Sequence, residues 1–125
     1  MIGSVIDAFA HGLGLTDFSW SRCRGVAVFA FDRRGTLYLE EHPEGLLMYL
    51  SRDFDARESV RARLTQALRL CHYRHSWPFV VQAGLRESSH LVFLVRLPLA
   101  EVTLPALEQA LDLLTRLHDQ TASAV

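Results

Sequence analysis

Hydrophobic residues occupy both faces of the strands expected between residues 25 and 50. Three strands, Gly25–Asp32, Thr36–Glu41 and Leu46–Leu50, are separated by two polar turns. A strand with one face in water should alternate hydrophobic and polar residues, and the first and third strands do not. On the first strand the two faces carry Ala27, Phe29 and Phe31 on one side and Val26, Val28 and Ala30 on the other. Both faces of this sheet are therefore expected to need cover.

Helical periodicity predicts a helix near each end of the chain. At the start, hydrophobic residues recur three and four positions apart, and Gly12 and Gly14 end the run. These residues are Ile2, Val5, Ile6, Phe9 and Leu13. The last helix should begin after Thr103, whose hydroxyl can cap it, with Pro105 in the first turn. The tail from Thr121 is expected to fray.

A second helix is predicted over Asp53–His75. Asp55 and Glu58 have the spacing of a capping box at its start. Arginines, Arg63 among them, are expected on its solvent-facing side. The hydrophobic stripe is expected at Val60, Leu64, Ala67, Leu68 and Cys71.

A second hairpin is expected from Phe79 to Leu97, turning at residues 87–89. The order of elements is then helix, three strands, helix, two strands and helix, without repeats or linkers. Short connections favour hairpins, so this order predicts an α+β fold, a twisted antiparallel sheet with three helices. We expect residues 1–125 to form a single domain.

Composition narrows the class of protein. Half of the 125 residues are hydrophobic and the formal net charge is -1, which indicates a folded chain without general affinity for nucleic acid. Two cysteines and the absence of a basic leader indicate a reducing, cytoplasmic setting. No hydrophobic run approaches the ~20 residues that a membrane span requires, so no stable membrane insertion is expected.

Two groups of side chains could carry chemistry, but neither forms a complete site. Cys71, His72 and His75 could hold a metal or serve a thiol nucleophile, yet a structural zinc site takes about four ligands. An enzyme using Cys71 with either histidine stays open as an alternative. Glu40 and Glu41 are adjacent on a strand, so their carboxylates point to opposite faces. No catalytic residue, metal site or cofactor is predicted.

An ordered set of short motifs resembles the class I chaperones of bacterial type III secretion, and within them the SycN subfamily. The resemblance spans nearly the whole chain and is weakest between Thr16 and Gly25. The motifs are Gly12-Leu13-Gly14-Leu15, Gly35-Thr36-Leu37, Leu39-Glu40, Leu46 to Arg52, Ala83-Gly84, Glu87-Ser88, Leu91-Val92, Thr103-Leu104-Pro105 and Leu107.

This resemblance implies a small cytoplasmic bacterial dimer without enzymatic activity, which can also lie peripherally at the secretion apparatus. It implies a heterodimer with a second chaperone subunit, a homodimer being the other possibility. The pair would hold the N-terminal segment of a secreted gatekeeper or effector protein, keeping it competent for export. The alternative is a small α+β ligand-binding or regulatory dimer with an apolar cleft.

The excess of hydrophobic residues suggests two binding surfaces for this role. An extended peptide can add to a sheet edge and insert alternate side chains into apolar pockets. The predicted substrate-binding residues are Val5, Ile6, Phe9, Val26, Val28, Phe29, Phe31, Leu37 and Leu39. The predicted dimer-interface residues are Val60, Leu64, Leu68, Cys71, Phe79, Val81 and Ala83.

Overall fold

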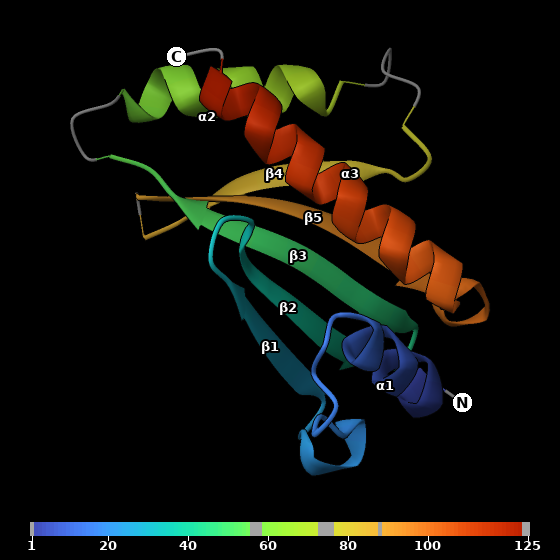
Figure 1. Ribbon diagram of the computed structural model, residues 1–125. Coiled ribbons are helices and arrows are strands. Elements are labelled where there is room, and N and C mark those ends of the chain that lie inside the picture. Colours follow the sequence, from blue (N-terminus) through green and yellow to red (C-terminus); the bar gives the residue numbers. More distant parts are fainter. Residues whose placement is uncertain (1, 56–58, 73–76, 88, 124–125) are drawn as a thin grey trace.

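A five-stranded antiparallel sheet forms the body of the protein in the computed structural model, which describes residues 2–55, 59–72, 77–87 and 89–123 (Figure 1). The strand order is β1-β2-β3-β5-β4, so β1 and β4 are the two edges. The α+β fold predicted from the sequence is confirmed. The elements are α1 (Ile2–Gly12), η1 (Trp20–Arg22), β1 (Val26–Phe31), β2 (Gly35–His42), β3 (Gly45–Asp53), α2 (Val60–Leu70), β4 (Val81–Arg86), β5 (His90–Pro98), η2 (Leu99–Glu101) and α3 (Leu104–Ser123).

Helices α1 and α3 cover one face of the twisted sheet, and α2 packs against α3 and β4 (Figure 1). The residues of β1 show this one-sided cover. Ala27 and Phe29 point to the helices and are buried, whereas Val26 and Val28 point away and are 44% and 56% exposed. Both faces of the sheet were expected to need cover. Helices cover one face, and no described helix lies over the other.

Helix α3 supplies the largest part of the helical cover. Thr103 caps it as predicted, since its Oγ1 accepts a hydrogen bond from the Ala106 N–H. The expected fraying from Thr121 is wrong. That residue is fully buried and its hydroxyl donates to the carbonyl of Leu117 at 2.7 Å, so the helix continues to Ser123.

Helix α2 is shorter than the sequence suggests. It begins at Val60, where the Ser59 hydroxyl accepts from the Ala62 N–H at 3.1 Å, and it ends at Leu70. The predicted start is wrong because Asp53 still belongs to β3, where it pairs with His90 of β5. Asp55 precedes the true cap, and Glu58, the other half of the predicted capping box, lies outside the described residues, as do residues 73–76.

The orientation of α2 also differs from the prediction. Arg63, expected in solvent, is 8% exposed, and its guanidinium lies 5.3 Å from the Phe54 ring centroid. Leu68, expected on the buried stripe, is 52% exposed. Helix α2 buries Arg63, Ala67 and Leu70. These residues have the spacing of one helix face, and so do the residues of the predicted stripe.

The connection after α1 is held to the body by two aromatic residues, Phe18 and Trp20. Phe18 lies 5.1 Å from Phe29, measured between ring centroids. The backbone N–H of the buried Trp20 donates to Asp7 Oδ1 of α1 at 2.7 Å. A β-carbon at Gly3 would lie 3.2 Å from the Trp20 ring, so glycine lets the indole approach the helix closely.

Candidate protein-binding surfaces

Edge strand β1 presents one candidate surface. It pairs with β2 on one side, and its other side is an edge of the sheet. Val26 and Val28 are exposed on the helix-free face, and Val5 of α1 and Phe31 are half-buried. An edge strand can pair with an extended segment of another chain, and this edge has apolar side chains beside it.

Five of the residues predicted to bind substrate lie in the chain's own core. Ile6, Phe9, Phe29, Leu37 and Leu39 are each at most 3% exposed. A partner could reach their side chains only by opening that core. The sequence could not separate the two groups, because core residues and binding residues on a strand are both hydrophobic.

Edge strand β4 and helix α2 present a second candidate surface. Val80, just before β4, is 87% exposed and Leu68 is half exposed. Trp77 Nε1 donates to the carbonyl of Leu70 at 2.6 Å, which ties the approach to β4 back to α2. Of the predicted interface residues, Val81 is buried and the remaining five are half-buried, namely Val60, Leu64, Cys71, Phe79 and Ala83.

The helix-free face of the sheet carries a polar and aromatic cluster that the sequence interpretation missed. Tyr38 and Tyr49 are paired across β2 and β3, and their rings stack with centroids 4.8 Å apart. The Tyr49 hydroxyl donates to Glu40 Oε2 at 2.6 Å. Arg86 of β4 reaches across this face to donate to the Tyr38 hydroxyl. The signal in the sequence is the alternation of Tyr38 and Glu40 with leucines, but strand register alone reveals their partners.

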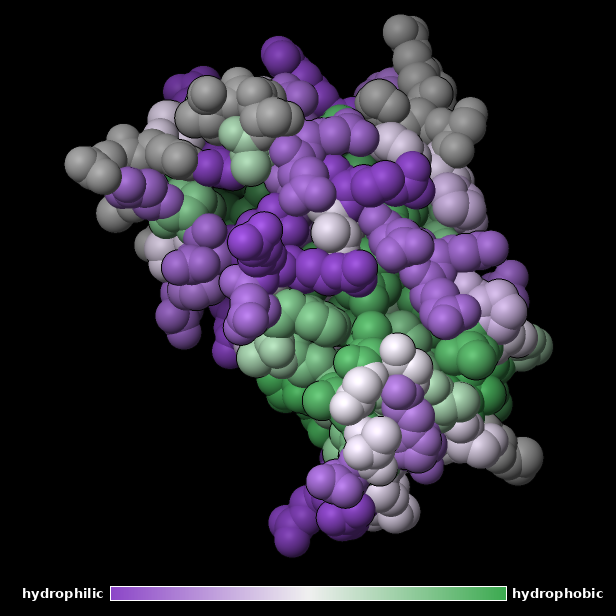
Figure 2. All heavy atoms as spheres, in the orientation of Figure 1, coloured by the Kyte–Doolittle hydropathy of each residue, from purple (hydrophilic) through white to green (hydrophobic). Residues whose placement is uncertain are grey.

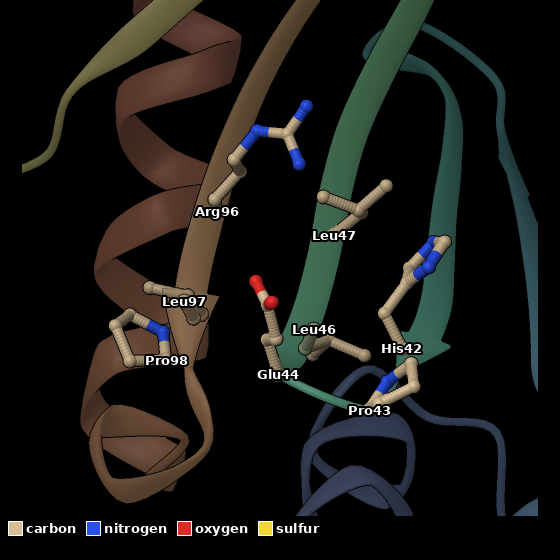
Figure 3. Close-up of a pocket in the computed structure, with 9 residues that line it drawn as sticks. His42, Pro43, Glu44, Leu46, Leu47, Arg96, Leu97 and Pro98 are labelled. Atoms are coloured by element: carbon tan, nitrogen blue, oxygen red, sulfur yellow. The ribbon is translucent and has the colours of Figure 1, made fainter.

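A cavity of about 630 Å³ lies at one end of the same face (Figure 3). Leu47 from β3 and Arg96 from β5 extend toward each other across it, and the Glu44 carboxylate stands between the strand ends. His42 and Pro98 complete its sides. Acidic, basic and apolar groups mix around this cavity, and their arrangement does not correspond to a specific ligand.

Within the part of the chain that the structure describes, the groups considered for chemistry do not form a complete site. Burial raises the pKa of the Cys71 thiol to about 11, so it is protonated and weakly nucleophilic near neutral pH. Within the described residues, no cluster of three histidine, cysteine or acidic side chains could hold a metal ion, and His75 lies outside them. None of the described helices is both long and apolar enough to cross a membrane.

Polar and apolar surface are segregated on the helical side of the molecule. In the orientation of Figure 1, hydrophilic side chains cover the upper part, where α2 and α3 run (Figure 2). Hydrophobic surface gathers below, around α1 and the adjoining strands (Figure 2). On this side of the molecule, apolar surface therefore lies where α1 meets the strands (Figure 2).

Comparison of the sequence with known families matches residues 1–122 to the model described as type III secretory system chaperone SycN. The chaperone protein SycN of Yersinia enterocolitica serotype O:8 / biotype 1B is 35% identical over 119 residues, which cover 95% of this chain and 94% of the relative. The SycN protein of Yersinia pseudotuberculosis serotype I has the same identity and coverage.

Solved structures of similar fold come from complexes. The Yersinia pestis chaperone SycH, solved with a stable fragment of YscM2, has a TM-score of 0.68 at 18% identity and covers 98% of both chains. A chain of the heterodimeric ExoU–SpcU complex of Pseudomonas aeruginosa has a TM-score of 0.69 at 16% identity, covering 93% of both chains. A chain of the HopA1–SchA chaperone–effector complex has a TM-score of 0.66 at 17% identity, covering 96% of this chain and 89% of that one.

Proposed function

Because the chain belongs to the SycN family of type III secretory system chaperones, we propose that it dimerises with a second small chaperone and holds the N-terminal segment of a secreted gatekeeper or effector protein. The binding of that segment keeps it unfolded and competent for export, and thereby regulates secretion. The role is binding and not catalysis, and it requires no cofactor.

The observation that carries the proposal is the strand order, which leaves two edges on opposite sides of the sheet. Each edge has exposed hydrophobic side chains beside it, Val26 and Val28 at β1 and Val80 and Leu68 at β4 with α2. Two edges can serve two partners at once without competition. We assign the β1 edge to the secreted protein and the β4 edge to the second subunit.

At the β1 edge, an extended segment would form main-chain hydrogen bonds with the outer side of β1. Its alternate side chains would lie over Val26 and Val28 on one face and toward Val5 of α1 on the other. Of the residues first predicted to bind substrate, these three and Phe31 can make such contacts without a change in the core. Support for a protein ligand comes from the complexes in which chaperones of this fold were solved.

At the β4 edge, the second subunit would cover Leu68 on α2 and Val80 before β4. Leu68 is 52% exposed and Val80 is 87% exposed, and burying the exposed part of each side chain contributes roughly 1–2.5 kcal/mol. The half-buried Val60, Leu64 and Phe79 lie around them in the predicted interface. The partner is proposed as a second chaperone of the same kind, and a second copy of this chain is the competing outcome.

Co-expression with a candidate secreted protein and the neighbour-encoded small chaperone tests the two assignments separately. Val28→Asp should abolish protection of the secreted protein's N-terminal segment from protease while the dimer persists by light scattering. Leu68→Asp should instead release the second subunit. Leu99→Asp is the matched control, because this leucine is 56% exposed and belongs to η2, not to β1, β4 or α2. A chain that stays monomeric with the second chaperone, and protects nothing, contradicts the proposal.

We propose further that residues 1–125 act as one chaperone domain in the bacterial cytoplasm and, peripherally, at the secretion apparatus. The hydrophobic core supports this, because α1, the sheet and α3 all contribute to one cluster of buried side chains. Fractionation of the native host under secreting and non-secreting conditions tests the location. Recovery in the membrane fraction after high-salt washing would contradict it.

A further inference from the structure

A pocket of about 360 Å³ lies on the helix-free face of the sheet, between the tyrosine pair and strand β4. Its lining combines apolar side chains with one carboxylate, one guanidinium, one amide and one aromatic ring. The residues are Glu40, Tyr49, Gln82, Ala83, Gly84, Leu85, Arg86, Val92 and Leu94. This volume is near the lower end of the range for specific small-ligand pockets, and it suits one large side chain better than a folded partner.

Tyr49 and Glu40 form a fixed wall of this pocket. Tyr38 stacks against Tyr49 at an interplanar angle of 13°, which holds the Tyr49 ring upright on the sheet. Burial, and then the hydrogen bond to Glu40, raise the pKa of Tyr49 to about 12, so its hydroxyl stays protonated and keeps donating to the carboxylate. The Glu40 carboxylate is therefore oriented before any ligand arrives.

Glu40 and Arg86 are the two charged residues of the lining, and Glu40 accepts its hydrogen bond from a neutral donor, Tyr49. Among the described residues no arginine or histidine forms an ion pair with it, and the ion pairs found join Arg34 to Asp112 and Arg52 to Asp119. A half-buried carboxylate beside apolar side chains gains from an added cation more than a fully solvated one does. At Glu40 the pocket therefore favours a cationic group, while the Arg86 guanidinium is held at Tyr38.

The same tyrosine pair already holds one guanidinium group from within the chain. Arg86 Cζ lies 5.1 Å from the Tyr38 ring centroid, and Nη1 donates to the Tyr38 hydroxyl. Arg86 is thus engaged at Tyr38, while Glu40 on the neighbouring wall is left to another donor. The contact between Arg86 and Tyr38 shows that a guanidinium group fits against these tyrosine rings.

We propose that this pocket binds the arginine side chain of a polypeptide lying on the helix-free face. The aliphatic stem would cross Leu94 and Val92, and the planar head would stack on Tyr49 and donate to the free oxygen of Glu40. A lysine offers a compact ammonium without a planar face, so arginine is favoured. The inference rests on the proposed function for the source of the polypeptide, a secreted protein whose segment would extend from the β1 edge across the helix-free face as far as β4, while the second subunit covers Val80 and α2.

Gly84 provides a way to fill the pocket without disturbing the fold. A β-carbon built at this position meets no atom within 4 Å, and its backbone is in ordinary strand conformation. Gly84→Val should therefore leave the sheet intact while narrowing the pocket. Glu40→Gln removes the charge but keeps an oxygen that can accept from Tyr49. Glu41→Gln is its matched control, an exposed neighbour on the same strand that does not line the pocket.

Titration of the full chain, or its complex with the second subunit, with N-acetyl-arginine methylamide tests the recognition directly by NMR. We expect saturable chemical-shift changes at Tyr49 and Leu94. The affinity for the arginine amide should be at least tenfold higher than that for the citrulline amide and at least fivefold higher than that for the lysine amide. Glu40→Gln and Gly84→Val should each weaken arginine binding at least tenfold, and Glu41→Gln less than twofold.

Equal binding of the arginine and citrulline amides, or unchanged binding to Glu40→Gln, would overturn the inference. A second arm uses the secreted protein. If Glu40→Gln and Gly84→Val protect its segment as well as the unmodified chain does, the pocket has no part in holding it and the inference fails while the proposed function stands. If the variants bind the arginine amide weakly and their protection of the segment from protease falls at least fivefold, both the arginine pocket and the proposed function are supported.

Discussion

The Nε2–H of His118 donates a hydrogen bond to the backbone carbonyl of Leu50, 2.8 Å away. This contact joins α3 to the middle of β3, and the imidazole packs edge-on against Phe93 with 4.8 Å between ring centroids. His118 is almost fully buried. A charged imidazole is poorly tolerated there, because the site is apolar and water is excluded.

Acid should destabilise the protein through His118. Burial first of all, opposed by the bond to Leu50, lowers the pKa of His118 to about 4, against about 6.5 when unfolded. The unfolded chain therefore binds the proton first, and stability present above pH 6.5 is lost as the pH falls toward 4. At roughly 1.4 kcal/mol per pH unit, this group should cost about 2 kcal/mol between pH 7 and 5.

Urea unfolding at the two pH values measures the effect, and His118→Gln is the matched variant. Its amide can still donate to the Leu50 carbonyl but does not titrate. The variant should lose markedly less stability than the unmodified chain on going to pH 5. Parallel losses in the two proteins would show that groups other than His118 dominate the acid sensitivity.

Gly35→Ala should destabilise the first hairpin strongly. Gly35 has φ of +111°, and a β-carbon there would lie 2.3 Å from the Ser51 carbonyl oxygen on the neighbouring strand. Relieving that overlap requires the backbone of β3 to move, so we expect a loss of about 2 kcal/mol or more. Thermal unfolding measures it. Gly12→Ala is the control, because its β-carbon meets no atom within 4 Å and alanine favours the helix by roughly 0.5–1 kcal/mol.

Asp7→Ala should loosen the connection between α1 and β1. It removes the acceptor of the Trp20 N–H and leaves a part-buried donor without its partner, which costs about 1–3 kcal/mol. Near-ultraviolet circular dichroism of the tryptophans and urea unfolding should both report the change. Asp7→Asn keeps an oxygen acceptor and should recover most of the stability; an equal loss in both variants would assign the effect to charge and not to the hydrogen bond.

Leu39→Asp and Val28→Asp should separate core residues from surface residues within the predicted substrate-binding set. Leu39 is fully buried on β2, and an unpaired carboxylate there should cost more than about 4 kcal/mol and prevent folding. Val28 is 56% exposed, and the same change should cost less than about 1 kcal/mol. Far-ultraviolet circular dichroism at a fixed temperature distinguishes the two. Equal loss of structure would mean that the outward face of β1 is covered in solution.

Hydrophobic runs bounded by turn residues, together with helical periodicity, were sufficient to predict the order of elements and the approximate place of each strand. The start of α3 followed from Thr103 and Pro105, because a capping hydroxyl and a first-turn proline act locally. The rotation of α2 did not follow, since Arg63, Ala67 and Leu70 repeat at the same spacing as the predicted stripe. Long-range packing against the body chose between the two faces.

The sequence by itself determined the fold class, the family and the hydrophobic excess of β1 and β3, because these depend on local patterns and on motif order. Only the tertiary structure decided which hydrophobic residues are core and which are accessible, since Val28 and Phe29 are adjacent hydrophobic residues of one strand that point to opposite faces. It also decided that β5 lies between β3 and β4, which makes β4 an edge. Strand order and register depend on contacts between residues far apart in the chain. For the same reason, only the folded sheet brings Glu40, Tyr49 and Gly84 around one pocket.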